Sequence, residues 1–233
     1  MLNVSNVTKK YGKVTANSDL SFEVRDGQVA ILVGPNGAGK STIIKCICGL
    51  LRFEGKISID DFDNKALEAK AKIGYVPEVP ALYELLTVEE HLEFIARGYN
   101  LTDWKAYAEE LLEKFELKDK RDKLGKELSK GMQQKVSICC ALLPRPKVII
   151  FDEPLVGLDP HGIKVLKETI RELKDGGTSM LISTHILDSV EDYWDVAHIM
   201  MNGKIAATRF REEEASNGSL EELFFNITEG KGE

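Results

Sequence analysis

The sequence lacks any apolar run long enough to cross a membrane. Its longest uninterrupted apolar stretches, such as 138–143 and 148–151, fall far short of the ~20 residues that a membrane-spanning helix requires. The first residues also lack the basic segment followed by an apolar segment that marks a secretory signal. We therefore expect a cytoplasmic chain with reduced thiols and no membrane span of its own.

The sequence lacks an excess of basic residues and contains few cysteines. Lysine and arginine total 31 against 38 aspartates and glutamates, which gives a formal net charge of −7. Proteins that bind nucleic acid nonspecifically usually carry a basic footprint, so we expect no nucleic-acid partner. Nowhere do the four cysteines show the C-x-x-C spacing of a zinc or redox motif, and we interpret them as small buried core residues: Cys46, Cys48, Cys139 and Cys140.

The sequence does contain enough apolar residues to fold into one compact domain. Its 233 residues are 43% hydrophobic and 30% charged, as in an ordinary globular protein. Alternating apolar positions predict an early run of strands, and a strand, a glycine-rich loop and a helix follow in that order. The expected elements are strands at 2–7, 20–24 and 29–33, a helix at 42–50, a strand at 56–60, a short helix at 64–72 and an extended segment at 73–77.

A helical block then interrupts this α/β pattern. Thr87 followed by Glu90 forms a capping-box pattern that predicts a helix start, and Pro144 and Pro146 end the block. Strand and helix patterns alternate again after the prolines. The expected elements are helices after 87, after 103 and at 130–142, a strand at 148–151, a helix at 160–174, a strand at 179–183, a hairpin at 196–208, a capped helix after 219 and a frayed tail at 228–233.

One glycine-rich segment carries a phosphate-binding pattern. Residues 34–41 read G-x-x-x-x-G-K-S, directly after a predicted strand and before a predicted helix. Glycines let successive backbone N–H groups point at phosphate oxygens, and the helix offers its positive N-terminal end. Lys40 would bring charge to the β- and γ-phosphates, and the Ser41 hydroxyl would bind Mg²⁺. The alternative, a glycine-rich turn with a solvated lysine, matches by chance in roughly one or two such chains per hundred.

Two carboxylates and a histidine follow later strands. Asp152 and Glu153 come directly after a buried strand, at the end where parallel sheets bind ligands. One carboxylate can hold Mg²⁺ through water while its neighbour polarises a lytic water. Alone, such a pair is more often an ordinary strand terminus, but downstream of a phosphate loop we favour the catalytic interpretation. His185 follows the next strand and is a candidate contact for the γ-phosphate, although a lone histidine is usually a satisfied polar residue.

Beyond the phosphate loop, the sequence resembles an ATP-binding cassette (ABC) ATPase over nearly its whole length. Six further segments match motifs of that family in order. They are Tyr11-Gly12 for the adenine-stacking loop, Gly74–Glu78 for the Q-loop, Leu128–Gln134 for the signature, Asp152–Pro154 for Walker B, Gly157–Asp159 for the D-loop, and His185 for the H-switch. The resemblance implies a P-loop NTPase core with an antiparallel β subdomain, in residues 1–85 and 145–233, and an inserted α-helical subdomain at about 86–144, together one ABC ATPase domain.

The resemblance also implies roles for individual residues. Tyr11 becomes the platform for the adenine ring, Glu153 the base that positions water, and His185 the γ-phosphate contact. ATP and Mg²⁺ are the implied ligands, and Ser129 with Gly131 would reach the γ-phosphate held by a partner copy. The implied phosphate-binding residues are Asn36, Gly37, Ala38, Gly39, Lys40, Ser41 and Thr42, and the implied metal ligands are Ser41, Glu78 and Asp152.

The motifs depart from the usual family pattern at four positions. Glu78 stands in place of the Q-loop glutamine and adds a negative charge near the γ-phosphate. The signature L-S-G-G-Q reads Leu128–Met132 here, so that Lys130 and Met132 replace the first glycine and the glutamine. Val156 replaces a common D-loop serine. Ser129 and Gly131 are retained, and they supply the hydroxyl and the close backbone contact that a phosphate needs.

The family implies that two cassettes face head to tail with ATP between them, so we expect a homodimer. With no membrane span in this chain, transport would require separate transmembrane permease subunits, and the cassette would lie on the inner face of the cell membrane. Glu78 and the L-S-K-G-M signature resemble ATPases of bacterial ABC-2-type exporters. Two alternatives stay open: a soluble ABC ATPase that is not coupled to transport, and an ATP-dependent interaction module with little turnover, which the presence of Glu153 and His185 disfavours.

Overall fold

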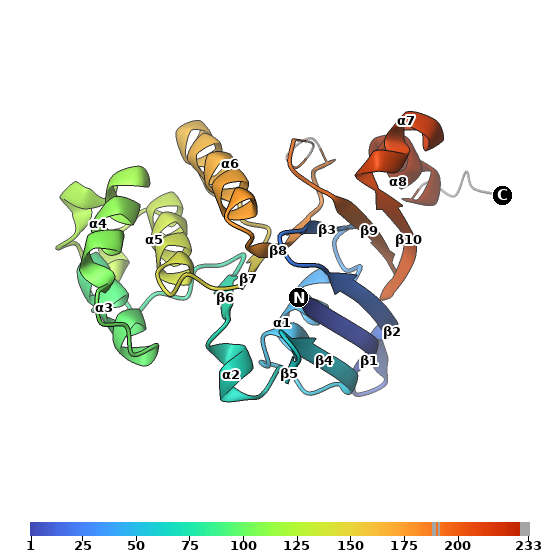
Figure 1. The fold of residues 1–233 in the computed structure, drawn as a ribbon, viewed down its shortest axis with the longest axis horizontal. Coiled ribbons are helices and arrows are strands. Elements are labelled where there is room, and N and C mark those ends of the chain that lie inside the picture. Colours follow the sequence, from blue (N-terminus) through green and yellow to red (C-terminus); the bar gives the residue numbers. More distant parts are fainter. Residues whose placement is uncertain (188–189, 191, 229–233) are drawn as a thin grey trace.

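The computed structural model describes residues 1–187, 190 and 192–228, and it contains two β-sheets with helices between and around them (Figure 1). The smaller sheet is antiparallel with strand order β2-β1-β4-β5. Its strands are β1 Leu2–Tyr11, β2 Val14–Val24, β4 Glu54–Ile59 and β5 Phe62–Asp63. β1 and β2 are longer than predicted, because their pairing continues through register shifts where the apolar alternation is interrupted. The tail expected at 228–233 lies, beyond Thr228, outside the described residues.

The larger sheet has six strands in the order β10-β9-β3-β8-β7-β6. Only β9 and β10 pair in antiparallel fashion, in the predicted hairpin with its turn at Asn202 and Gly203. The parallel strands end along one edge of the sheet, where the predicted functional residues follow. The strands are β3 Val29–Val33, β6 Ile73–Val76, β7 Val148–Asp152, β8 Ser179–Thr184, β9 Val196–Met201 and β10 Lys204–Phe210.

Several helices begin at a side-chain cap. Thr87 Oγ1 accepts from Glu90 N at 3.1 Å and Thr87 N donates to Glu90 Oε2 at 2.7 Å, which confirms the predicted capping box. The helix expected at 64–72 covers only Leu67–Lys70 in the structure. Asn64 lies outside the helix, because its Nδ2 atom donates to the Cys46 carbonyl oxygen at 2.8 Å and holds it near the end of α1. The α-helices are α1 Lys40–Ile47, α2 Leu67–Lys70, α3 Val88–Gly98, α4 Trp104–Lys114, α5 Lys130–Leu142, α6 Pro160–Asp175, α7 Glu214–Asn217 and α8 Leu220–Thr228. The 3₁₀ turns are η1 Lys118–Lys120, η2 Gly125–Glu127 and η4 Arg211–Glu213.

Two apolar cores cover the two faces of the six-stranded sheet. Ala30 and Leu32 of β3 face α1 and the antiparallel sheet, whereas Ile31 and Val33 face the core that α3 to α6 build. This alternation is the expected pattern for a strand buried on both faces. Helices α3, α4 and α5 stand together on one side of the molecule and are called the helical block below (Figure 1). Among the described residues, no helix is both long and apolar enough to span a bilayer.

The prediction that all four cysteines are buried is half wrong. Cys46 and Cys139 are buried, but Cys48 and Cys140 are partly exposed. Cys48 lies just past the end of α1 and Cys140 lies on α5, and both face a groove between the helical block and the sheet. Although part of the Cys140 residue is exposed, the surrounding protein desolvates its thiol and raises the pKa of that thiol to about 12, so it stays protonated at neutral pH.

Candidate functional site

The phosphate loop connects β3 to α1 and is shaped by two glycines in the left-handed region. Gly37 and Gly39 have φ angles of 84° and 101°. A Cβ atom on Gly39 would lie 2.4 Å from Asn17 Nδ2, so only glycine fits there. Gly39 is also the N-cap of α1 and offers no side-chain hydrogen bond to it. The first N–H groups of α1 are therefore oriented as in other anion-binding helix N-termini.

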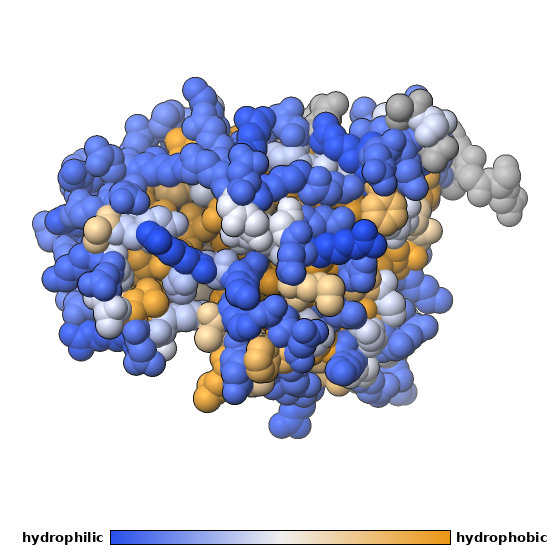
Figure 2. Space-filling model, viewed as in Figure 1, coloured by the Kyte–Doolittle hydropathy of each residue, from blue (hydrophilic) through white to orange (hydrophobic). Residues whose placement is uncertain are grey.

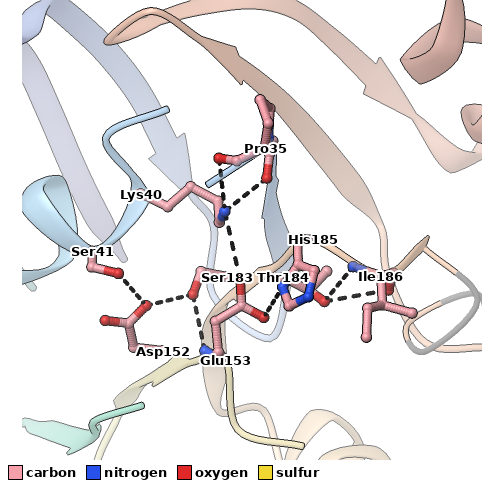
Figure 3. A network of polar contacts seen from close by, with 10 residues as sticks. Pro35, Lys40, Ser41, Asp152, Glu153, Ser183, Thr184, His185 and Ile186 are labelled. Atoms are coloured by element: carbon pink, nitrogen blue, oxygen red, sulfur yellow. Dashed lines mark hydrogen bonds and ion pairs between the residues drawn. The ribbon is translucent and has the colours of Figure 1, made fainter. Parts of the chain in front are cut away.

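The Lys40 side chain is buried next to this loop. Its Nζ atom donates to Gly34 O at 2.7 Å and to Pro35 O at 3.4 Å (Figure 3). The same Nζ atom lies 3.6 Å from Glu153 Oε1, with both side chains less than one-tenth exposed. The ammonium group is thus fixed between the loop carbonyls and a carboxylate, in the position that a phosphate-binding lysine requires.

Asp152 ends β7 with its side chain buried. Its Oδ1 atom accepts from Ser41 Oγ at 3.0 Å and from Ser183 Oγ at 2.7 Å. These bonds join the start of α1, the end of β7 and the end of β8 at one carboxylate (Figure 3). A buried carboxylate is tolerated because hydrogen bonds to it are charge-assisted and replace its hydration.

Glu153 is the next residue, and its backbone is left-handed with a φ of 49°. This conformation turns its side chain away from the course of the strand and toward the phosphate loop. Glu153 Oε2 lies 3.0 Å from Nδ1 of His185, and Oε1 faces Lys40 (Figure 3). The carboxylate therefore lies between a lysine and a histidine at the end of β7.

Most of the predicted site residues line one cavity of about 630 Å³. Ala16 of β2 and Val156 also contribute to its wall, and Asp152 is hydrogen-bonded to the wall residue Ser41. The cavity collects residues from five separate parts of the chain, as expected for a site at the edge of a parallel sheet. The predicted residues that line it are Asn36, Gly37, Ala38, Gly39, Lys40, Ser41, Thr42, Glu78, Glu153 and His185.

Three predicted residues lie away from that cavity. Tyr11 ends β1 with 48% of its surface exposed, and Lys9 Nζ lies 4.7 Å from its ring centroid. Ser129 and Gly131 begin α5, where Ser129 Oγ caps the helix by accepting from Met132 N at 3.3 Å. Within one chain these two signature residues do not line the phosphate cavity.

Sequence analysis missed three buried polar residues around the site. Asn17 Nδ2 donates to Gly39 O at 3.1 Å and fixes the phosphate loop. Gln134 Nε2 lies 3.5 Å from Pro77 O and 3.4 Å from Pro154 O, which links the signature helix to two other motifs. Ser183 contacts Asp152 directly. One sequence signal could have identified Asn17, because it is a polar residue at an inward-facing position of strand β2.

Comparison with known proteins decides the family. Residues 17–156, more than half of the chain, match the family model described as ABC transporter. The chain belongs to this family. The cassette is 37% identical over 238 residues to the ABC-type transporter ATP-binding protein EcsA of Bacillus subtilis (strain 168), covering 98% of the cassette and 96% of EcsA. It is 35% identical to the lantibiotic transport ATP-binding protein SrtF of Streptococcus pyogenes, covering 97% and 96%.

A solved structure agrees with these matches. The structure described as the ATP-binding subunit of an ABC transporter superposes on the cassette with a TM-score of 0.91 at 38% identity, covering 98% of the cassette and 99% of that chain. The predicted family, the P-loop NTPase fold and the ATPase activity are thereby confirmed. The cassette is an ATP-binding and ATP-hydrolysing subunit of an ABC transporter.

Proposed function

We propose that two copies of the cassette pair around ATP and Mg²⁺ and drive an exporter built with separate membrane subunits. Cassettes of this family form dimers and work with transmembrane subunits. An export role is supported by the relative SrtF, which is named for lantibiotic transport. In this proposal residues 1–85 and 145–233 form the nucleotide-binding core, residues 86–144 form the helical subdomain, and the cassette lies on the inner face of the cell membrane without binding nucleic acid.

The phosphate loop supplies the main binding interactions for ATP. Its backbone N–H groups and the N-terminus of α1 contact the phosphates, and Lys40 moves from the loop carbonyls and Glu153 to the β- and γ-phosphates. Tyr11 stacks on the adenine ring from the exposed end of β1. Residues 36–42 of the cavity wall carry this role together.

The donor set beside the loop fits Mg²⁺. Ser41 Oγ and Asp152 Oδ1 are 3.0 Å apart, and the carboxylate of Glu78 belongs to the same cavity wall. All three side chains offer oxygen atoms, the ligands that this hard cation prefers. When bound, the metal would neutralise charge on the phosphates.

Glu153 is the general base of the proposed reaction. The observation that carries the proposal is its carboxylate, held between Lys40 and His185 at the wall of the phosphate cavity. Phosphoryl transfer to water depends mostly on positioning and charge neutralisation. Glu153 orients the attacking water and accepts its proton, and His185 contacts the γ-phosphate from the neighbouring strand end.

The substitution Glu153→Gln tests this assignment. It removes the base but keeps the shape of the side chain, so turnover should fall by about 10²- to 10⁴-fold while ATP affinity is retained. The ATP-bound dimer should accumulate, as measured by size-exclusion chromatography with Mg·ATP. Glu168→Gln, at a half-exposed position on α6, is the control. Equal hydrolysis by the two variants would remove Glu153 from the mechanism.

The partner copy completes each site through its signature. Ser129 and Gly131 lie at the exposed start of α5, away from the phosphate cavity of their own chain. The Ser129 hydroxyl and the Gly131 amide then reach the γ-phosphate bound by the other copy. ATP thus joins two surfaces, and its cleavage shifts the population toward separated cassettes.

The membrane subunits dock in the groove between the helical block and the six-stranded sheet. This groove has a volume of about 560 Å³ and an aromatic wall that includes Tyr75, Tyr83, Phe94 and Tyr99. Figure 2 shows apolar surface beside the notch where the helical block meets the rest of the molecule. A short amphipathic helix of a membrane subunit, with its apolar face in the groove, matches this lining.

Capture from membranes separates transport from the alternatives. A tagged cassette purified from detergent-solubilised membranes of its source cells should bring down an integral membrane protein in a fixed ratio. Recovery of the cassette alone, with full ATPase activity, would favour a soluble ABC ATPase. Recovery of ATP-binding material with negligible turnover would favour an interaction module.

A further inference from the structure

A fully buried serine connects the Asp152 carboxylate with the backbone of Glu153. Ser183 lies next to the end of β8 with no exposed surface, and its register partner in β7 is Asp152. Its hydroxyl lies between the Asp152 carboxylate and the backbone amide of Glu153 (Figure 3). Both bonds lie at the sheet edge where the phosphate loop ends.

The donor and acceptor roles of the Ser183 hydroxyl are fixed by its two neighbours. Ser183 Oγ donates its single proton to Asp152 Oδ1 at 2.7 Å and accepts from Glu153 N at 3.0 Å. An ionised carboxylate can only accept, and an amide N–H can only donate. The two partners therefore fix the direction of the O–H bond, and neither bond competes with the other.

Each bond constrains a different functional group. Together with the Ser41 hydroxyl, Ser183 fixes Oδ1 of Asp152, and every side-chain hydrogen bond to Asp152 from the described residues goes to that oxygen. The backbone N–H of Glu153 donates to Ser183 Oγ at 3.0 Å and also to the carbonyl oxygen of Ser183 at 3.2 Å. These bonds support the left-handed backbone of Glu153, which an L-residue otherwise avoids.

We propose that Ser183 is a positioning residue that sets the geometry of Asp152 and Glu153 through one hydroxyl. This proposal rests on the roles proposed for those two carboxylates. The hydroxyl orients Asp152 for the metal and holds the Glu153 backbone in the turn that brings its carboxylate to Lys40 and His185. Ser183 itself is fully buried and does not line the cavity, so in this proposal it acts through its two neighbours.

The substitutions Ser183→Thr and Ser183→Val form the decisive pair, because the new side chains have the same shape and differ by one hydroxyl. The threonine variant keeps both bonds and suits a strand, whereas the valine variant loses both bonds. The valine variant should lose about 10- to 100-fold in kcat relative to the threonine variant, with KM for ATP changed much less. Equal kcat values for the two variants would overturn the proposal.

Ser179 provides a matched control in the same strand. It is also buried, but its Oγ atom has no hydrogen-bond partner among the described residues. Ser183→Ala should lower kcat while Ser179→Ala should not. With ADP present, electron paramagnetic resonance should show weaker Mn²⁺ binding to Ser183→Ala but unchanged binding to Ser179→Ala.

Two results separate this proposal from the proposed function. Inactive Glu153→Gln with fully active Ser183→Val and normal Mn²⁺ binding would refute only the role of Ser183. A fully active Glu153→Gln variant would instead refute the role of Glu153 in the proposed function, on which the role of Ser183 rests. Equal loss of activity in Ser183→Ala and Ser179→Ala would show general disruption of β8 and would also count against Ser183.

Discussion

The phosphate cavity and the groove differ in how their walls are built. The cavity is polar, and its charged groups are held in a continuous series of hydrogen bonds and ion pairs from Lys40 to His185. The groove is apolar and aromatic, and much of its wall is partly exposed. A polar site must be preorganised because misplaced buried charges are costly, whereas an apolar groove gains most of its binding energy when a partner covers it.

The two regions also use histidine differently. His185 is exposed enough to meet a ligand and faces the Glu153 carboxylate. His91, at the groove, is buried, accepts from Tyr83 N through Nε2 at 2.9 Å and contacts Thr87 O through Nδ1 at 2.6 Å. His91 thereby orders the loop that contains Tyr83. The ring centroids of Tyr83 and Phe94 are 5.3 Å apart. In the proposed function His185 contacts the γ-phosphate, whereas His91 orders the loop at the groove.

Among the substitutions that compare the cavity with the groove, Lys40→Ala in the cavity should have the largest effect on binding. The substitution removes the buried ammonium group that we propose to bind the phosphates, and hydrogen bonds to charged groups contribute about 1.5–3 kcal/mol each. ATP affinity measured by calorimetry with Mg²⁺ should fall by roughly 10- to 100-fold. Lys45→Ala, on the exposed side of α1, should bind ATP normally. Normal affinity in Lys40→Ala would exclude this lysine from the site.

The cavity was largely predictable because its key residues are contiguous motifs. Residues 34–41 directly follow a strand and contain both the loop and the start of a helix, so local rules suffice. Ser183 was not predictable in the same way. Its role depends on the parallel register that places it beside Asp152, 31 residues earlier, and no local pattern specifies that pairing.

The groove was much less predictable than the cavity. Its wall combines residues from the end of α1, from β6, from the loop before α3, and from α3 and α5. Exposed aromatics such as Tyr83 and Phe94 look like ordinary loop and helix residues in the sequence. The interpretation of Cys48 and Cys140 as core residues failed for the same reason, because only the packing of the helical block decides which apolar residues stay uncovered.

The second prediction breaks the groove and leaves the cavity intact. Phe94→Glu places a charge on the aromatic wall, and loss of one anchor of this kind costs about 2 kcal/mol or more, which is roughly 30-fold in affinity. Capture of the membrane protein from solubilised membranes should fall accordingly, with unchanged ATPase activity of the isolated cassette. Phe225→Glu is the control, because Phe225 on α8 has 46% exposure against 52% for Phe94. Equal capture by both variants would exclude this groove as the docking site.

The third prediction addresses the connection between the two regions. Lys135 of α5 is nine-tenths buried, and its Nζ atom lies 3.3 Å from Asp159 Oδ1 and 3.6 Å from Glu116 Oε2. Asp159 caps α6 near the cavity, and Glu116 follows α4 in the helical block. Breaking a buried ion pair costs about 3–5 kcal/mol, but both carboxylates here are half-exposed and remain hydrated. Lys135→Met should therefore lower the free energy of unfolding by about 2 kcal/mol.

Urea unfolding measures this effect. Lys164→Met removes an exposed pair with Glu168 and should change the free energy of unfolding by less than about 0.5 kcal/mol. If Lys135→Met were as stable as Lys164→Met, the buried lysine would not hold the helical block to the cavity side of the molecule.

The smallest effect concerns a histidine that belongs to neither region. Burial lowers the pKa of His198 in β9 to about 4, and its Nδ1 atom pairs with Thr208 Oγ1 at 2.9 Å. In the unfolded chain the pKa of histidine is about 6.5, so the unfolded state binds a proton first as the pH falls. Below pH 6.5 the folded state should lose stability until about pH 4, with a loss of about 1–2 kcal/mol between pH 7 and pH 5.

The substitution His198→Gln separates this scaffold effect from the chemistry of the cavity. It removes the titrating ring, so the free energy of unfolding should depend less on pH between about 4 and 6.5 than in the unaltered protein. ATP turnover at pH 7 should not change, because His198 lies outside the cavity wall. His161→Gln, at an exposed position, should keep the original pH dependence of stability. An identical pH dependence in all three proteins would show that His198 is not responsible for the acid sensitivity of the fold.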